Sequence, residues 1–422
     1  MASATASVAE VCSAAKSASR TLARADSALR DAALRAIAQS LTERSGEILA
    51  ANELDMQAGA EADIGSALLD RLLLDERRLE AIAQAVREIV ALPDPVGEVI
   101  DGHRLPNGLD VRRVRVPLGV VAVVYEARPN VTIDATALCL KSGNAIVLRG
   151  SSTAAHSNAA LARVAADAVA SCGLPESCVS LVAGGGREEL AELATARESV
   201  DLIIPRGGEG LKDALQAVAT VPVIYAASGN CHVFVDASAD LGMAEAIAIN
   251  AKTQRPGVCN AAETLLVHER CAGELLPRLL PLLEHAGVQL RGDERTRALA
   301  GPEAHVEPAT ESDWATEYLD LVLAVRVVPS VADAIEHIGR YGSGHSEAIV
   351  TADARSARAF QLGVDAACVY VNASTRFTDG GEFGMGAEIG NSTQKLHARG
   401  PIGLRELCTF KYLVEGDGQV RS

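Results

Sequence analysis

The sequence predicts an α/β fold with two α/β domains and a small β arm. The chain has 422 residues, 48% of them hydrophobic, which is enough for two or three domains with large cores. From Gly119 onward, short apolar runs rich in β-branched residues alternate with segments of helical periodicity. Such alternation is typical of parallel sheets with helices on both faces. A turn that contains Pro256-Gly257 and then Cys259 separates two alternations of this kind.

The region before the first alternation is predicted to be helical. The Ala-rich segment 7–57 has apolar residues at helical spacing, and two helices are expected there with a break near Ala25-Asp26. A second helical pair is expected over 66–92, because Pro93-Asp-Pro95 ends the pattern. These segments contain no cluster of reactive side chains, so we expect them to cover a sheet.

A hairpin is predicted between these helices and the first alternation. Pro106-Asn107-Gly108 is a turn signal, and the flanking segments Val99–Arg104 and Leu109–Val116 have few apolar residues. A central strand would need a more apolar sequence, so this hairpin is expected to form an exposed arm.

The two alternations define the expected domains. In the first, strands are expected at 120–125, 145–148, 178–182, 201–204, 221–225 and 232–235, with helices at 132–141, 153–171, 187–196 and 209–218. In the second, strands are expected at 263–267, 319–327, 347–350 and 367–371, with helices at 271–284, 331–338 and 354–362. The first layout is typical of nucleotide-binding domains. We therefore assign a cofactor-binding domain to residues 1–98 and 118–250, a catalytic domain to 251–395, and an arm to 99–117 and 400–422.

Composition excludes several classes of partner. The net charge of -16 argues against nucleic acid and anionic membranes as partners, since either needs a basic face. The longest apolar run, Leu118–Tyr125, is too short to span a bilayer, and the first residues lack a signal core. The nine cysteines form no C-x-x-C pair and no metal-ligand spacing. Reduced thiols in a cytoplasm, and no bound metal, are therefore expected.

Cys259 is the candidate nucleophile. It follows a turn that neither a helix nor a strand tolerates, and it precedes an apolar strand. Lys252, Arg255 and main-chain amides flank it and would favour the thiolate. A buried cysteine that acts only as a small hydrophobic residue is the alternative.

Three segments carry a family resemblance. They are N-A-K-T-Q-R-P-G-V-C-N-A-A-E-T-L-L-V at 250–267, A-R-P-N-V-T at 127–132 and E-F-G-M-G-A-E-I-G at 382–390. Together they resemble the gamma-glutamyl phosphate reductases, or glutamate-5-semialdehyde dehydrogenases, which are proline-biosynthesis enzymes of the aldehyde dehydrogenase superfamily. The resemblance runs from about Ala9 to the C-terminus. It implies an aldehyde dehydrogenase-like fold and a homo-oligomer, in which the hairpin arm pairs with a C-terminal strand of a partner subunit, here 407–414.

The resemblance also implies a mechanism. Cys259 would attack the acyl carbon of glutamyl 5-phosphate, and Asn130 would stabilise the resulting oxyanion together with the backbone amide of Cys259. From the residues alone, Asn130 is better interpreted as a helix cap. Because the acyl phosphate is labile, a transient contact with glutamate 5-kinase is a further hypothesis.

A nicotinamide cofactor is expected at the ends of the first strands, although the sequence has no G-x-G-x-x-G motif. Arg149, Ser151 and Ser152 follow a strand, where they can hold a ribose 2'-phosphate or form an ordinary turn before a helix. The resemblance favours the first interpretation and hence NADP(H). Further cofactor contacts are expected from Gly207, Gly208, Glu317 and Phe383. Without the resemblance, the glycines would be plain turns and Glu317 a solvated charge.

Substrate contacts are expected around a polar, Gly-rich loop that follows the strand at 367–371. Loops of this length inside compact domains are usually functional. The candidate substrate-binding residues are Arg128, Arg255, Ser374, Thr375 and Arg376. For Arg128, a surface ion pair is the alternative. The loop hydroxyls and Arg376 are expected to bind the amino-acid end of the substrate.

One departure from aldehyde-oxidising relatives bears on the reaction. Those enzymes place a general-base glutamate in a segment that aligns with 226–232, where this chain has no carboxylate. A reductase of acyl phosphates needs no such base, and His232 is expected to be structural. The alternatives are a superfamily member that oxidises aldehydes or reduces acyl thioesters, and a catalytically silent nucleotide-binding scaffold.

Overall fold

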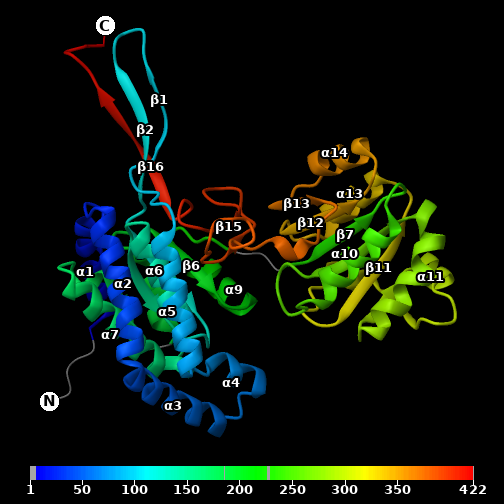
Figure 1. The fold of residues 1–422 in the computed structure, drawn as a ribbon, viewed down its shortest axis with the longest axis horizontal. Coiled ribbons are helices and arrows are strands. Elements are labelled where there is room, and N and C mark those ends of the chain that lie inside the picture. The colour runs from blue at the N-terminus through cyan, green and yellow to red at the C-terminus, as the bar shows by residue number, and fades with distance from the viewer. Residues whose placement is uncertain (1–5, 185, 226–228, 422) are drawn as a thin grey trace. The chain divides into compact units, whose positions relative to one another are not determined.

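The computed structural model describes residues 6–184, 186–225 and 229–421. Contacts within the chain divide it into two compact units, each with its own parallel sheet (Figure 1). The first unit consists of residues 1–225, 385–390 and 402–422, and the second of residues 226–384 and 391–401.

The sheet of the first unit has four parallel strands. In sheet order they are β5 Val179–Leu181, β4 Ala145–Arg149, β3 Val120–Tyr125 and β6 Leu202–Arg206. All six side chains of β3 are buried, as its continuous β-branched sequence predicts for a strand covered on both faces. The strand expected at 221–225 is reduced to one bridge between Val223 and Ile203. Pro222 has no N–H to donate to a ladder, which limits pairing there.

Helices cover both faces of this sheet (Figure 1). They are α1 Val8–Leu22, α2 Ser27–Glu43, α3 Ser45–Glu61, α4 Ser66–Leu72, α5 Glu76–Ala91, α6 Asn130–Lys141, α7 Ala155–Ser171, α8 Arg187–Thr195 and α9 Glu209–Val218. Apolar residues of α1, α8 and α9 form one core with β3 and β4. On the other side, α6 and α7 contact the strands, and α2 and α5 pack on these helices. The break expected near Ala25-Asp26 is confirmed, since Asp26 caps α2, and a further break at Arg44 was not expected.

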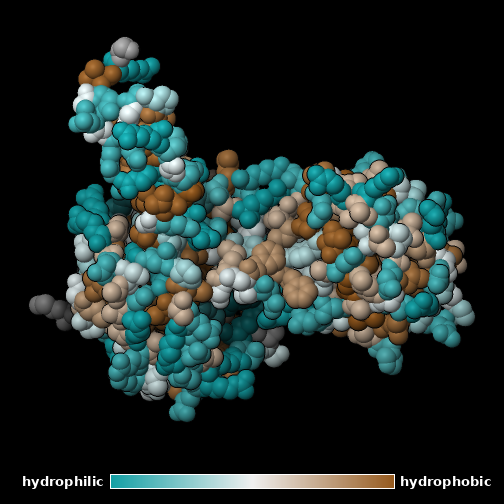
Figure 2. All heavy atoms as spheres, turned by 45° about the horizontal axis from the view of Figure 1, so that its top comes forward, coloured by the Kyte–Doolittle hydropathy of each residue, from teal (hydrophilic) through white to brown (hydrophobic). Residues whose placement is uncertain are grey.

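The arm is a three-stranded antiparallel sheet. Strand β2 Asp110–Pro117 lies between β1 Val99–Arg104 and the C-terminal strand β16 Cys408–Glu415 of the same chain. The expectation that 407–414 pairs with the hairpin of a partner subunit is therefore wrong for β2, because both of its edges are filled within one chain. Phe410, Tyr412 and Val414 alternate along β16 and are exposed, so they share one face of the arm. Hydrophobic residues at the surface of the arm appear brown in Figure 2.

The sheet of the second unit has seven parallel strands. In sheet order they are β10 Val306–Pro308, β9 Gln289–Gly292, β11 Val322–Val328, β8 Ala262–His268, β7 Cys231–Val235, β12 Ser346–Val350 and β13 Cys368–Val371. The helices are α10 Leu241–Thr253, α11 Glu269–His285, α12 Glu294–Leu299, α13 Val331–Tyr341 and α14 Ala354–Gly363. One core contains α10 and α11, and a second contains α13 and α14. Elements β9, α12 and β10 were not expected from the sequence.

The boundary between the units lies at residues 225 and 226, whereas the sequence placed it at residue 250. Strand β7 pairs with β8 and β12 in the second sheet, and α10 packs in the same unit. Residues 385–390 return to the first unit, where the backbone N–H of Ile389 donates to the carbonyl of Ile402 over 2.9 Å. Connectivity along the chain did not reveal these pairings.

Candidate active site

Cys259 lies in the turn between α10 and β8, in the second unit. Helix α10 ends at Thr253, and the turn closes with a hydrogen bond of 3.0 Å from the backbone N–H of Ala261 to the carbonyl of Val258. The next strand, β8, is buried over its whole length, but Cys259 is only half-buried. A rigid central strand therefore holds a cysteine that retains access to solvent.

Gly229, just before β7, and Cys231, the first residue of β7, hold the main chain of Cys259. The thiol of Cys231 donates to the carbonyl of Cys259 over 3.2 Å. Gly229 packs directly on the same peptide, and a Cβ at this position would overlap the carbonyl carbon and oxygen of Cys259. The backbone N–H of Gly229 donates to Oε1 of Glu317 over 2.6 Å. Glu317, which the sequence predicted as a cofactor contact, thus fixes the backbone that covers Cys259.

The polar loop after β13 is bonded to the residue that follows Cys259. The side-chain amide of Asn260 donates to the carbonyls of Thr378 over 3.0 Å and Arg376 over 3.3 Å. In return, Thr375 Oγ1 donates to the carbonyl of Asn260 over 2.7 Å. Ser374 Oγ accepts from the backbone N–H of Arg376 over 3.3 Å and caps a short 3-10 helix. The hydroxyls of Ser374 and Thr375 are thus used to build the loop, and they place Arg376 beside the nucleophile turn.

Arg376 and Arg255 bring positive charge to this turn. The Nε–H of Arg376 donates to Oε1 of Gln254 over 2.9 Å, which orients the guanidinium. Burial and the like charge of Arg255 lower the pKa of Arg376, and the neighbouring Cys259 opposes this shift. Within the described residues, no carboxylate lies within ion-pair distance of either arginine. Two cations without a carboxylate partner favour both a thiolate and a bound anion.

Lys252 does not have the role expected from the sequence. Its ammonium pairs with Oε2 of Glu263 over 2.6 Å, and both side chains are fully buried. Burial raises the pKa of Glu263 to about 7 and lowers that of Lys252. Oε1 of Glu263 also accepts from the backbone N–H of Leu319 over 3.2 Å. The lysine therefore ties α10 to β8 and does not pair with the thiol.

His232 is structural, as expected. It is fully buried, and its Nδ1 lies 2.9 Å from Oε2 of Glu347, which also accepts from the backbone N–H of His232 over 2.7 Å. Both residues lie on adjacent strands, β7 and β12. This pair joins two central strands. Phe383, an expected cofactor contact in the same unit, is exposed, with its ring centroid 6.4 Å from that of Tyr370.

Asn130, in the first unit, is the first residue of α6 and makes no cap with its side chain. Its Nδ2 donates to Oδ2 of Asp134, one turn later on the helix, over 2.9 Å. An amide group has two N–H donors, so this bond orients the side chain and leaves the second donor for another group. Arg128, two residues earlier, is exposed. The cap interpretation of Asn130 is therefore wrong, and an oriented donor is found instead.

Asp134→Asn is expected to stabilise the protein at alkaline pH. Burial raises the pKa of Asp134 to about 6, although Asn130 and Arg206 oppose the shift. The pKa of Asp134 is higher in the folded protein than in the unfolded chain. Below about pH 4 the carboxyl is protonated in both states and costs no stability, whereas the folded protein is progressively destabilised as pH rises through about 6 and the buried carboxyl ionises. The variant should gain about 1–2 kcal/mol at pH 8 after allowance for solvent screening, and little at pH 4. Thermal unfolding at both pH values checks this; a gain independent of pH would contradict it.

The carboxyl ends of β4 and β6 present donors that fit a nucleotide. Arg149 is the last residue of β4, and Nη2 of its guanidinium donates to the carbonyl of Gly186 over 2.8 Å. Burial lowers the pKa of Arg149, and nearby Glu189 opposes this. Ser151 Oγ is buried with no hydrogen-bond partner among the described residues, and Ser152 is exposed. A hydroxyl without a partner, two residues after an arginine at the end of a strand, fits a ribose or its phosphate.

The loop after β6 contains Gly207 and Gly208, and the side chain of Glu126 lies close to it. The backbone N–H of Gly208 donates to Oε2 of Glu126 over 3.2 Å, and a Cβ at Gly207 would lie 2.7 Å from the Glu126 carboxyl carbon. A Cβ at Gly208 would meet no atom within 4 Å. A side chain at Gly207 would thus displace Glu126, whereas Gly208 leaves open space at the start of α9, where an anionic group is favoured.

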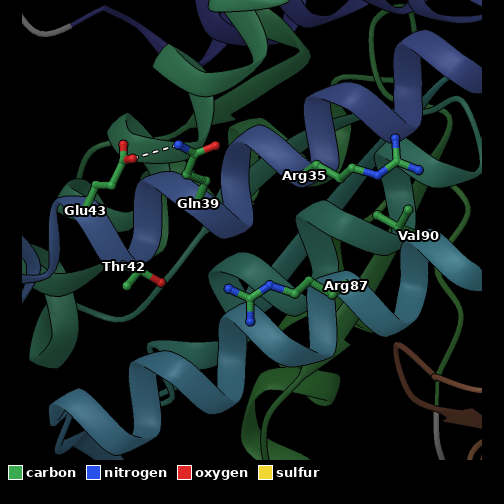
Figure 3. Close-up of a pocket in the computed structure, with 6 residues that line it drawn as sticks. All are labelled: Arg35, Gln39, Thr42, Glu43, Arg87 and Val90. Carbon is green, nitrogen blue, oxygen red and sulfur yellow. Dashed lines mark hydrogen bonds between the residues drawn. The ribbon is translucent and has the colours of Figure 1, made fainter.

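The first unit also has a cavity in its helical layer. About 600 Å³ in size, it lies between α2 and α5 and is lined by Arg35, Gln39, Thr42, Glu43, Arg87 and Val90 (Figure 3). Gln39 donates to Glu43 over 2.7 Å, and Arg87 pairs with Glu80 over 2.7 Å. Among the described residues, no group of His, Cys, Asp and Glu forms a metal-ion site. In the same part of the chain, every helix is too short or too polar to cross a membrane.

Comparison with known proteins identifies the family. A model of the aldehyde dehydrogenase family matches residues 1–309. The gamma-glutamyl phosphate reductase of Moorella thermoacetica is 58% identical over 407 residues, which cover 96% of this chain and 97% of the relative. The chain belongs to the gamma-glutamyl phosphate reductase family. The reductase of Thermobifida fusca is 55% identical over 414 residues, 98% of each chain.

Solved structures agree with this family. The crystal structure of gamma-glutamyl phosphate reductase from Thermotoga maritima has a TM-score of 0.97 and 48% identity, and the match covers 99% of this chain and 100% of that chain. An acetylating aldehyde dehydrogenase from Geobacillus thermoglucosidasius, at 18% identity and a TM-score of 0.67 over 98% and 97% of the two chains, shares the fold alone. The expected aldehyde dehydrogenase-like α/β fold is confirmed, as is the class of enzyme, an oxidoreductase of proline biosynthesis. Gamma-glutamyl phosphate reductases, as members of this family, use a nicotinamide cofactor.

Five residues that the sequence did not single out contribute to the arrangement. They are Asp134, Gly229, Cys231, Gln254 and Asn260. Gln254 and Asn260 lie within a few residues of Cys259 in sequence, but no spacing pattern distinguishes them from ordinary neighbours. The Gly229–Cys259 contact joins residues far apart in sequence, so only the packing of the second sheet reveals it.

Proposed function

We propose that the protein reduces L-glutamyl 5-phosphate to L-glutamate 5-semialdehyde with NADPH and releases phosphate. The observation that carries this proposal is the pair Arg255 and Arg376 beside a half-buried Cys259. A thiol nucleophile that acts on an ordinary aldehyde needs no anion site next to it. An enzyme whose substrate releases phosphate does need an anion site next to the nucleophile, where the phosphate is bound.

The chain supplies the groups for acyl transfer. The Cys259 thiolate attacks the acyl carbon, and the oxyanion that forms accepts from the backbone N–H of Cys259 and from Nδ2 of Asn130. The C–O bond to phosphate then breaks, and the phosphate dianion leaves into the field of Arg255 and Arg376. We assign Arg376 to phosphate rather than to the amino-acid end, because its backbone is bonded to Asn260, next to the nucleophile. A thioester on Cys259 remains.

NADPH, when bound, supplies the hydride that converts this thioester to the aldehyde. We propose that Arg149, Ser151 and Ser152 hold the adenosine ribose and its 2'-phosphate, with Gly207 and Gly208 near the start of α9. Glu317 and Phe383 are proposed for the nicotinamide half. The unpaired hydroxyl of Ser151 supports the first assignment. The guanidinium of Arg149 supports NADP(H) over NAD(H), because a phosphate needs a cation.

The segment before β7 supports reduction over hydrolysis. A hydrolytic dehydrogenase needs a carboxylate base to activate water against the thioester. Aldehyde-oxidising relatives carry that base in the segment that aligns with 226–232. Residues 226–228 of this segment lie outside the described residues, and their sequence is Ala-Ala-Ser. Of the described remainder, Gly229 packs on Cys259 and His232 is bound to Glu347.

The test is the reverse reaction. Purified protein is mixed with glutamate-5-semialdehyde, in equilibrium with its cyclic imine, and with NADP+, and NADPH absorbance is followed with and without inorganic phosphate. Strict dependence on phosphate is expected, since phosphate must take the acyl group from Cys259. NADPH formation in the absence of phosphate would instead indicate a hydrolytic dehydrogenase and overturn the proposal.

The exposed apolar face of β16 supports association of the arm with a further copy of the chain. We therefore propose that the protein is a homo-oligomer. We also propose that it works in the cytoplasm. A transient contact with glutamate 5-kinase remains a prediction, since no described residue points to it.

A further inference from the structure

A small cavity in the first unit contains the proposed oxyanion donor. It has a volume of about 220 Å³ and lies among α4, α5 and the start of α6. Its wall includes Asn130, Arg71, Arg78, Leu73, Leu74 and Ile82. All of these residues belong to one compact unit, so the cavity does not depend on the second unit.

The two arginines of this cavity differ in what they bind. Arg78 forms an ion pair of 2.6 Å with Asp70 and donates to the carbonyl of Leu73 over 2.9 Å, so it secures the end of α4. Arg71, in the last turn of α4, is exposed. It makes no ion pair or hydrogen bond within the described residues. Arg71 is therefore the cation of the cavity that remains available to a ligand.

The remaining wall is apolar. Leu74 and Ile82 are buried and Leu73 is half-buried, and all three line the same cavity as Asn130 and Arg71. Aliphatic side chains of this kind suit the methylene groups of a short carbon chain. The cavity thus combines a donor for a carbonyl oxygen, a short apolar stretch and a cation for an anionic end.

We propose that this cavity binds the amino-acid end of the substrate, with Arg71 paired to the α-carboxylate. This inference rests on the proposed function. When the reacting carbonyl oxygen accepts from Asn130, the glutamyl chain runs along Leu73, Leu74 and Ile82, and its carboxylate reaches the guanidinium. Carbons C5 and C1 are four bonds apart, about 5 Å when extended.

The test is Arg71→Gln in the reverse reaction, with three Michaelis constants measured. We expect kcat/KM for glutamate-5-semialdehyde to fall about 10- to 100-fold, mainly through KM, because a charge-assisted pair is lost. The KM values for phosphate and NADP+ should stay as in the wild type. Arg71→Lys keeps the positive charge but loses the two parallel N–H donors of the guanidinium. Its kcat/KM for the semialdehyde should therefore lie between those of the wild type and Arg71→Gln. Arg77→Gln, an exposed arginine of α5 outside the cavity, is the matched control and should behave as the wild type.

The outcomes separate the inference from the proposed function. If Arg71→Gln has a wild-type KM for the semialdehyde, or if all three KM values rise together, Arg71 does not bind the carboxylate. Either result leaves the phosphate dependence of the wild type intact. Failure of the proposed function shows instead as NADPH formation by the wild type without phosphate. Thermal unfolding of each variant confirms that the compared proteins are folded.

Discussion

Cys259→Ala is expected to lower turnover more than about a thousandfold, because no other described group can form the thioester. Cys259 is the half-buried thiol of the turn between α10 and β8, beside Arg255 and Arg376. The proposed cofactor residues of the first unit are unchanged in this variant, so NADPH binding should persist. Reverse-reaction kinetics measure the loss, and a fluorescence titration with NADPH measures the binding.

Cys172→Ala is the matched control for this variant. Cys172 is also half-buried, but it follows α7 in the first unit and no proposed role involves it. This control should keep full turnover. Residual activity of Cys259→Ala above about a thousandth of the wild type would exclude Cys259 as the nucleophile.

Gly229→Ala is expected to have the second largest effect. The added Cβ would overlap the carbonyl group of Cys259, and backbone atoms cannot rotate away as a side-chain end can. The turn must shift by a substantial fraction of an ångström, and displacement of a reacting group by about 1 Å costs about 100-fold in rate. The strain should also destabilise the protein by about 1–3 kcal/mol. Turnover and the thermal midpoint are the measurements.

A second glycine provides the control for this substitution. Gly273 is an exposed residue within α11, and a Cβ there would meet no atom within 4 Å. Gly273→Ala should leave turnover unchanged and raise stability by about 0.5–1 kcal/mol, because alanine favours helices. Wild-type turnover in Gly229→Ala would show that the position of the Cys259 peptide is not limiting.

Local patterns predicted most elements of the fold. The all-apolar run of β3, the break before Asp26 and the turn at Pro256-Gly257 each follow from side-chain chemistry within a few residues. Short elements with weak patterns, such as β9 and β10, were missed. The sheet to which a strand belongs was also beyond local information: β7 looked like the end of the first alternation but lies in the middle of the second sheet.

The candidate site likewise has residues that the sequence singled out and partner residues that only the structure revealed. Cys259, Asn130 and Arg376 were proposed from the sequence because their segments are distinctive. Their partners were not, since each partner is brought near by packing over long sequence separations, as in the contact of Asn260 with the carbonyl of Thr378. Lys252 illustrates the consequence: it lies seven residues before Cys259 in sequence but pairs with Glu263, which joins α10 to β8.

By itself, the sequence determined the α/β class, most of the helix and strand pattern, the candidate nucleophile Cys259 and the absence of a carboxylate at 226–232. These depend on side chains and local periodicity. Only the tertiary structure decided that Glu317 holds Gly229, that Gly229 covers Cys259 and that Asp134 orients Asn130. Hydrogen bonds and close packing are short-ranged, so their partners are set by which elements the fold places in contact.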